Sequence, residues 1–248
     1  MIELAMPFAS LSFSIFEFYA AGITVILLLA FLASRLEPKR YYFIRHGKTF
    51  HNEQGIKQGE EGSLNPEGVR QAEKLGLYLK HLRIRSVYTS PYPRAVETAE
   101  RIHATTHARI IKTPLLAERK NPSEVIGKSV HDPAVEEAVA LIEQGYHDDT
   151  FRFSDEENFS DLKKRAARCQ RYLETRPGTR FAVVTHHAFL QIFLSYLLYG
   201  KELHSTEYVK MAFFNPSDNG GLTVCDYHPW RRFSPTRGWE IIAYNEPI

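Results

Sequence analysis

Two patterns of hydrophobic and polar positions alternate along this chain. Short, largely apolar runs predict strands at 40–45, 86–89, 108–112 and 181–185. Apolar residues at spacings of three and four predict helices that begin at Pro66 or cover 92–104, 159–174 and 188–199, with a further helix near 133–144. Because strands and helices alternate, we expect an α/β domain with a mainly parallel central sheet. An antiparallel pair at 222–227 and 239–243 would close it.

A different pattern opens the chain. From Phe18 to Ser34 the sequence holds 17 uncharged, mostly apolar residues. A helix from about Ser14 to Ser34 is long enough to cross a bilayer. We therefore expect an N-terminal transmembrane helix as a membrane anchor at 1–35, followed by one folded domain at 36–248. Basic residues come directly after the apolar run and none precedes it, so the positive-inside rule places that domain in the cytoplasm.

Two other interpretations of the first segment stay open. A cleaved signal peptide needs a basic start and small residues before the cleavage site. This segment instead has Glu3 near its start, and the bulky Phe31 and Leu32 stand near its end. A buried core helix is the other interpretation, but such a helix would precede the first strand without an obvious packing partner.

Composition narrows the class of protein. The chain has 248 residues, 44% hydrophobic and 24% charged, with 2 cysteines, which excludes a disordered chain, a collagen-like repeat and a disulfide scaffold. The net charge of +2 predicts no strong affinity for nucleic acid. Residues 35–248 hold all 31 Lys and Arg and 27 of the acids, and so carry +4. Cys169 and Cys225 are expected in the core of a protein from a reducing compartment.

Arginine and histidine side chains follow three of the predicted strands. Arg45 and His46 follow the first strand, Arg94 lies just after the second, and His186 follows the strand at 181–185. Because ligand sites in open α/β sheets lie at the carboxyl ends of strands, we expect these side chains to meet. Two guanidinium groups with two imidazoles suit a phosphate, since an arginine fork matches two phosphate oxygens.

With these residues in place, the chain resembles the histidine phosphatase superfamily, which has the phosphoglycerate-mutase-like fold. The resemblance covers about residues 40–245. It rests on the ordered motifs RHGKTFHN (45–52), IKQGEEGSLNPEGVRQAEKL (56–75), YTSPYPRAVETAERI (88–102), LLAER (115–119), ENFSDLKKRAARCQRYL (157–173) and VVTHHAF (183–189). A single R-H-G is weak evidence, whereas the whole set is specific. The resemblance implies a three-layer α/β domain, here preceded by the expected transmembrane helix.

The resemblance also implies roles for the matching residues. His46 would attack phosphorus and carry the phosphoryl group, since a neutral imidazole is a competent nucleophile near pH 7. Arg45, Arg94 and His186 would bind the phosphoryl oxygens and stabilise the charge that develops during transfer. Because these groups supply a positive field, no metal or other cofactor is implied.

Three further residues complete the expected site. Asn52 would hydrogen-bond the phosphate or the attacking water. Glu118 would donate a proton to the leaving alcohol and then accept one from water, with Glu124 as an alternative acid from the segment 119–158. His187 stands where the family usually has a small residue, and it would either line the substrate pocket or cap the following helix.

Together these residues predict a metal-independent phosphatase that hydrolyses a phosphomonoester through a phosphohistidine on His46. The substrate would be a phosphorylated small molecule or a phosphoprotein. The protein would be a single-pass membrane protein with a cytoplasmic catalytic domain. Two alternatives stay open: phosphoryl transfer of the phosphoglycerate mutase type, and a catalytically inactive, membrane-anchored binding protein. The first is disfavoured because the sequence lacks long substrate-binding insertions, and the second because the site residues are retained.

Overall fold

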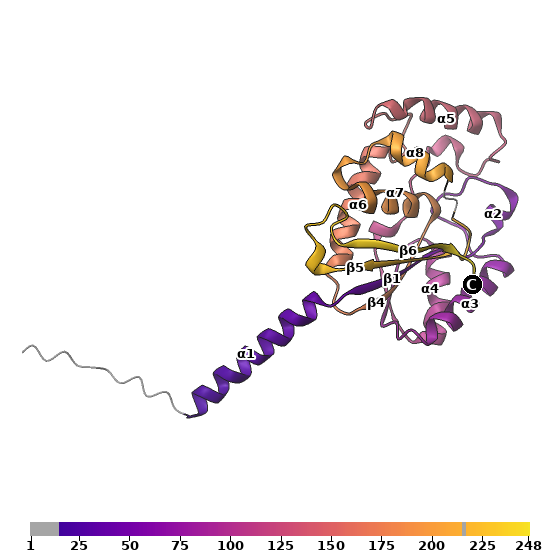
Figure 1. Cartoon of the computed structure of the whole chain (residues 1–248). Helices are drawn as coiled ribbons and strands as arrows, with labels where there is room; N and C mark the ends of the chain where they lie inside the picture. The colour runs from indigo at the N-terminus through magenta and orange to yellow at the C-terminus, as the bar shows by residue number, and fades with distance from the viewer. Residues whose placement is uncertain (1–14, 215–216) are drawn as a thin grey trace, which may run out of the picture. The chain divides into compact units, whose positions relative to one another are not determined.

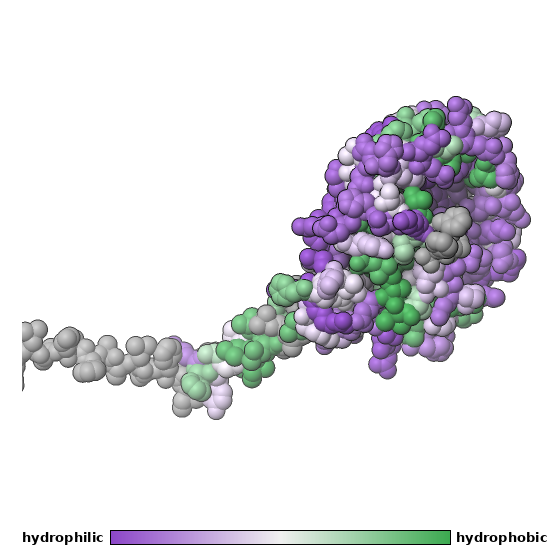
Figure 2. Space-filling model, turned by 45° about the horizontal axis from the view of Figure 1, so that its top comes forward, coloured by the Kyte–Doolittle hydropathy of each residue, from purple (hydrophilic) through white to green (hydrophobic). Residues whose placement is uncertain are grey.

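The computed structural model describes residues 15–214 and 217–248, and the chain divides into two units, Met1–Glu37 and Pro38–Ile248. The described part of the first unit is one helix, α1 (Ile15–Leu36), with apolar residues along much of its surface (Figure 2). Ser14, where we expected the helix to start, lies outside the described residues. Within the described ranges, no helix has both the length and the apolarity that a bilayer crossing requires. The predicted transmembrane helix is therefore not supported.

The second unit is built on a six-stranded mixed sheet (Figure 1). Its strands are β1 (Lys39–Arg45), β2 (Ser86–Thr89), β3 (Arg109–Lys112), β4 (Arg180–Thr185), β5 (Leu222–Tyr227) and β6 (Trp239–Glu246). The order is β3-β2-β4-β1-β5-β6. The first four strands in this order pair in parallel, and β5 and β6 add antiparallel pairings at one edge. The predicted strands and the closing antiparallel pair are confirmed.

Helices cover both faces of this sheet and make three layers (Figure 1). The helices are α2 (Phe50–Gln54), α3 (Pro66–Lys80), α4 (Pro93–Thr106), α5 (Pro133–Gln144), α6 (Phe159–Glu174), α7 (His187–Tyr199) and α8 (Ser205–Phe214). The five predicted helices are confirmed as α3 to α7. Helices α2 and α8 were not predicted, because the first is a single capped turn and the second has its apolar residues crowded into its last seven positions, without a clear helical spacing.

Strand β1 is apolar along most of its length because it is buried on both faces of the sheet. Tyr41 and Phe43 point into the core cluster under α6 and α7, where the ring centroid of Phe43 lies 5.1 Å from that of Phe193 and 6.0 Å from that of Tyr41. Tyr42 and Ile44 point into the cluster under α3 and α4. The strand is therefore held from both sides, and its carboxyl end is a rigid place for Arg45 and His46.

The R-H-G glycine is required by a close backbone approach. A Cβ on Gly47 would lie 2.4 Å from the carbonyl oxygen of Gly68, in the first turn of α3. In the same way, a Cβ on Gly68 would lie 2.1 Å from the carbonyl oxygen of Lys48. The two glycines thus let the amino end of α3 pack directly against the segment that follows β1.

Candidate active site

Two histidines lie together at the carboxyl ends of the central strands. Strands β1 and β4 pair in a register that sets Arg45 beside Thr185, so the next residues, His46 and His186, are neighbours. Their ring centroids are 5.0 Å apart. The two residues are 3% and 0% exposed. The expected meeting of these side chains is therefore present in the structure.

One ring nitrogen of His46 hydrogen-bonds a backbone carbonyl, and the other has no hydrogen-bond partner within residues 15–214 and 217–248. Its Nδ1 lies 2.8 Å from the carbonyl oxygen of Gly47. Because a carbonyl can only accept, Nδ1 carries the hydrogen in this contact, and Nε2 then holds a lone pair. Burial, followed by the charges of Arg94 and Arg45, lowers the pKa of His46 well below its usual value. The imidazole is therefore neutral at pH 7 and nucleophilic at Nε2.

His186 is held by a residue that the sequence did not indicate. Its Nε2 lies 2.8 Å from the hydroxyl of Ser90, which directly follows β2. Its Nδ1 is buried with no hydrogen-bond partner in the described part of the chain. Burial, followed by the neighbouring His46 and Arg94, lowers the pKa of His186 well below its usual value. Ser90 stands in the S-P-Y-P segment that marks the end of β2, but nothing in that pattern predicts its contact with a histidine 96 residues away.

Arg94 is buried, Arg45 is half-buried, and each keeps a spare donor among the described residues. One terminal nitrogen of Arg94 donates to the carbonyls of Gly59, Glu60 and Glu61 at 3.0–3.2 Å, and one of Arg45 donates to a backbone carbonyl in the loop before β5. The Nε–H of each has no partner among the described residues. Burial lowers the pKa of Arg94 to about 10, which leaves it charged at pH 7. Spare donors on buried cations are suited to an anion.

The loop before β5 contacts the segment that carries His46. The amide nitrogen of Asn219 donates to the carbonyl of His46 at 3.0 Å and to Oδ1 of Asn52 at 3.1 Å. The same Oδ1 accepts the backbone N–H of Thr49 and closes the capping box of α2. The side-chain oxygen of Asn52 thus has a structural task, and only its Nδ2 remains to donate to a phosphate. Asn219 was not predicted, because its N-G-G context resembles an ordinary turn.

Glu118 lies at the amino end of α7. Its Oε1 accepts the backbone N–H groups of Arg119 at 2.8 Å and Phe189 at 3.0 Å. Its Oε2 accepts the N–H of Ala188, at 3.2 Å, and no other donor among the described residues. Since α7 begins directly after His186, these contacts bring the half-buried carboxylate close to the histidine pair. The helix dipole and its free N–H groups favour a carboxylate at this position.

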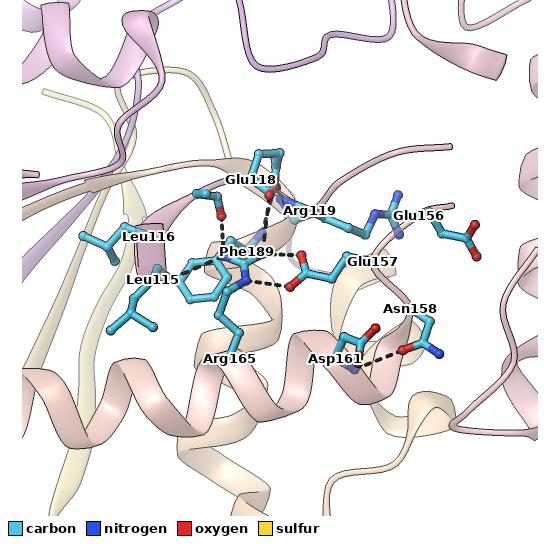
Figure 3. Close-up of polar contacts among 12 residues, drawn as sticks. Leu115, Leu116, Glu118, Arg119, Glu156, Glu157, Asn158, Asp161, Arg165 and Phe189 are labelled. Carbon is cyan, nitrogen blue, oxygen red and sulfur yellow. Dashed lines mark hydrogen bonds and ion pairs between the residues drawn. The ribbon is translucent and has the colours of Figure 1, made fainter. Parts of the chain in front are cut away.

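Arg165 of α6 holds the segment that carries Glu118 (Figure 3). Its guanidinium donates to the carbonyls of Ala117 at 2.6 Å and Leu115 at 3.3 Å. It also forms a two-pronged ion pair with Glu157 and lies 4.3 Å from the ring centroid of Phe189. Arg165 and Glu157 both fall in a motif of the resemblance, but the sequence did not show which carbonyl groups they would meet.

The remaining candidates have different surroundings. Glu124 is exposed, and its carboxylate accepts the hydroxyl of Ser154, so it shows none of the contacts that bring Glu118 to the site. His187 is the first residue of α7, and its Nδ1 lies 2.8 Å from the hydroxyl of Ser217. His187 also lines a cavity. The two cysteines are free and buried in the core, and burial raises the pKa of Cys169 to about 12.

The sequence of the chain is similar to known phosphatases over part of its length. The chain is 32% identical over 109 residues to fructose-2,6-bisphosphatase TIGAR B of Danio rerio, which covers 36% of this chain and 42% of that protein. It is 52% identical over 42 residues to a broad-specificity phosphatase of Saccharomyces cerevisiae, which covers 16% and 18%. The chain thus spans less than half of the length of the curated relatives that it matches.

Solved structures resemble most of the chain. A mycobacterial glucosyl-3-phosphoglycerate phosphatase superposes with a TM-score of 0.69 at 19% identity, over 84% of this chain and 99% of that chain. At this identity the likeness concerns the fold. The sequence model described as "Histidine phosphatase superfamily (branch 1)" matches residues 41–236, most of the chain. With the strand-end histidines and arginines in that range, the chain belongs to the histidine phosphatase superfamily.

Proposed function

We propose that this chain hydrolyses a phosphomonoester through a phosphohistidine on His46, without a metal ion. The observation that carries the proposal is the state of His46: a buried, neutral imidazole whose Nδ1 is tied to a carbonyl and whose ring lies beside His186, within the field of Arg94 and Arg45. Such a ring is a prepared nucleophile. The relatives named as phosphatases support hydrolysis over phosphoryl transfer between two substrates.

In the first step, Nε2 of His46 attacks phosphorus and the bond from phosphorus to the ester oxygen breaks. Arg45, Arg94 and His186 bind the phosphoryl oxygens as charge spreads over them. The spare Nε–H groups of both arginines and the unpartnered Nδ1 of His186 support this role. The guanidinium groups supply the positive charge, so the step needs no Lewis acid.

The leaving oxygen needs a proton, which Glu118 delivers from Oε2. A phosphomonoester that binds as its monoanion carries one proton, because its second pKa is close to 6. Oε2 accepts this proton and passes it to the leaving oxygen, while Oε1 stays bonded to two backbone amides. The products of the step are the alcohol, the phosphohistidine and an ionised Glu118.

In the second step, water attacks phosphorus and the bond from phosphorus to Nε2 breaks. Glu118 accepts a proton from the water and returns it to the phosphate, so His46 is again neutral and the sum is ester plus water to alcohol plus phosphate. The Nδ2 of Asn52 donates to the phosphoryl group or to the water, which leaves its Oδ1 in the capping box.

A trapping experiment on the full chain tests the proposal. We expect the wild type to hydrolyse p-nitrophenyl phosphate in the presence of a chelator and to form an acid-labile, base-stable phosphoenzyme. His46→Ala should lose both. The matched control His81→Ala removes an exposed histidine at the end of α3 and should keep both. Hydrolysis or a labelled phosphoenzyme that survives in His46→Ala would overturn the proposal.

A further inference from the structure

A cavity of about 360 Å³ is lined by His187, which directly follows His186, and the proposed chemistry leaves this cavity unassigned. It opens between α5, α7 and α8 and the loops that carry Lys57 and Arg119, and His187 and Ala188 form its wall toward the site. This volume is in the range of small-molecule pockets. The backbone N–H of Ala188 also donates to Glu118, so one lining residue of the cavity contacts the carboxylate that would protonate the leaving oxygen. A leaving group that departs toward Glu118 would move toward this cavity.

Two cations that repel each other line the cavity. Burial, followed by the charge of Arg119, lowers the pKa of Lys57. Glu143 is the one acidic residue in the described lining, and its attraction only partly offsets that repulsion. Within residues 15–214 and 217–248, no carboxylate is in ion-pair distance of the Lys57 ammonium. An anion placed between the two cations would relieve their repulsion.

The charge of Glu118 acts on two groups of cations, one at the site of phosphoryl transfer and one in the cavity. Its charge acts on Arg45 and Arg94, which would bind the transferred phosphoryl group. It acts as well on Lys57 and Arg119, in the cavity. When Glu118 holds the proton for the leaving oxygen, its compensating charge is gone, and the cavity is then more positive. The site therefore attracts a second anion most strongly in the state that is ready to react.

Apart from Gln191, the rest of the cavity lining is apolar and aromatic. Tyr146 and Tyr208 line it with ring centroids 6.4 Å apart, in an edge-to-face arrangement. Val139, Ile142 and Val209 complete this wall. Such a lining holds a hydrocarbon or aromatic body, whereas the cations at the other side hold a charged group.

We infer that the substrate is a phosphomonoester whose leaving group has an apolar body and a second anionic group, which Lys57 and Arg119 bind. The inference rests on the proposed hydrolysis at His46 and names the substrate class of that site. Lys57 is the sharper test, because Arg119 also donates its backbone N–H to Glu118 and its substitution would disturb the proton donor.

Two aryl phosphates that differ by one charge test the inference. We would compare 4-carboxyphenyl phosphate with 4-carbamoylphenyl phosphate, its neutral isostere, on the full chain. We expect the wild type to show a kcat/KM at least about tenfold higher for the carboxylate, as a charge-assisted hydrogen bond provides. In Lys57→Met this ratio should fall close to one. Lys57→Arg should restore it, and the control Lys80→Met, which removes an exposed lysine of α3, should keep it.

A binding measurement separates this inference from the proposed hydrolysis. In His46→Ala, calorimetry with both esters should give tighter binding of the carboxylate, and the further change Lys57→Met should remove the preference. If the wild type hydrolyses both esters equally well, the inference is wrong and the proposed function stands. If neither ester is hydrolysed, the proposed function fails, and equal affinities in calorimetry would then overturn the inference as well.

Discussion

The guanidinium of Arg165 and the carboxylate of Glu157 face each other as a two-pronged ion pair. Nε donates to Oε1 at 2.7 Å, and a terminal nitrogen donates to Oε2. The two side chains are only 8% and 18% exposed. The other donors of Arg165 reach the carbonyls of Leu115, Ala117 and Glu118. The pair thus connects α6 to the segment that presents the proposed proton donor.

Removal of one partner of this pair should destabilise the fold. Arg165→Met leaves the Glu157 carboxylate buried and unpaired, and such a loss costs about 3–5 kcal/mol of unfolding free energy. The double variant Arg165→Met/Glu157→Met removes both charges and should recover much of that loss. Arg165→Lys should recover less, because an ammonium cannot form the fork and reach the carbonyls together. Urea unfolding measures each value, and equal stability of the single and double Met variants would contradict the assignment.

The same double variant should still be a poor catalyst for esters of weakly acidic alcohols. Its Glu118 segment has lost the guanidinium donors, so kcat should fall, while the KM changes less. A low kcat in a stable double variant indicates that the pair positions Glu118. If the pair were only structural, the double variant would recover its activity together with its free energy of unfolding. Steady-state kinetics on an alkyl phosphate below the melting temperature provides the measurement.

Glu118→Gln should make the rate depend on the leaving group. An amide cannot deliver a proton from Oε2, so hydrolysis of an alkyl phosphate should fall by about 10²–10⁴-fold. Hydrolysis of p-nitrophenyl phosphate should fall far less, because p-nitrophenolate leaves without a proton. Glu124→Gln is the matched control, as its carboxylate is exposed and bound to Ser154. Equal losses for both esters in Glu118→Gln would assign the carboxylate a structural task alone.

The protonation of His46 should occur at unusually low pH. Burial and the charges of Arg94 and Arg45 lower its pKa, so the neutral nucleophile is lost only when the pH falls well below the ordinary histidine value of about 6.5. Imidazole nitrogen NMR should show a neutral ring at pH 6. Arg45→Gln removes one nearby cation and should raise the pKa. Arg40→Gln, at the opposite end of β1 and paired with Asp226, should leave it unchanged. A positively charged His46 at pH 6 in the wild type would refute this prediction.

Gly47→Ala should destabilise the second unit and displace His46. The new Cβ would lie 2.4 Å from the carbonyl oxygen of Gly68, and backbone on both sides leaves little room to relax. We expect a loss of about 1–3 kcal/mol or more, as for other overpacked sites. Gly59→Ala is the control, because its Cβ meets only the flexible side chain of Ile126, at 3.2 Å. Thermal unfolding compares the two, and a smaller loss for Gly47→Ala would contradict the close approach.

The sequence predicted most elements of the second unit for a local reason. Strand β1 is flanked by polar residues and buried on both faces, so its apolar run stands out. Helix α3 begins at Pro66, as the sequence predicted from a proline in the first turn, and the side chain of Asn65 caps it. Helix α8 was not predicted because its apolar residues are crowded into positions 208–214 without a clear helical spacing, and Tyr208 meets the core only in the folded chain.

The candidate site was predictable where its residues follow strands. His46, Arg94 and His186 could be placed together because parallel strands bring their carboxyl ends to one edge of a sheet. Ser90, Asn219 and the other residues that orient this set were not predictable. Each acts through a hydrogen bond to a group far away in the sequence, and no local pattern records such a partner.

The sequence by itself determined the succession of strands and helices along the chain and the family. It also determined which residues could carry phosphate chemistry, because periodicity and motifs are properties of neighbouring residues. Only the tertiary structure decided which nitrogen of His46 is free and what the carboxylate of Glu118 contacts. It also decided that Lys57 and Arg119 share a cavity. These properties depend on burial and on contacts across tens of residues, which exist only once the helices have packed on the sheet.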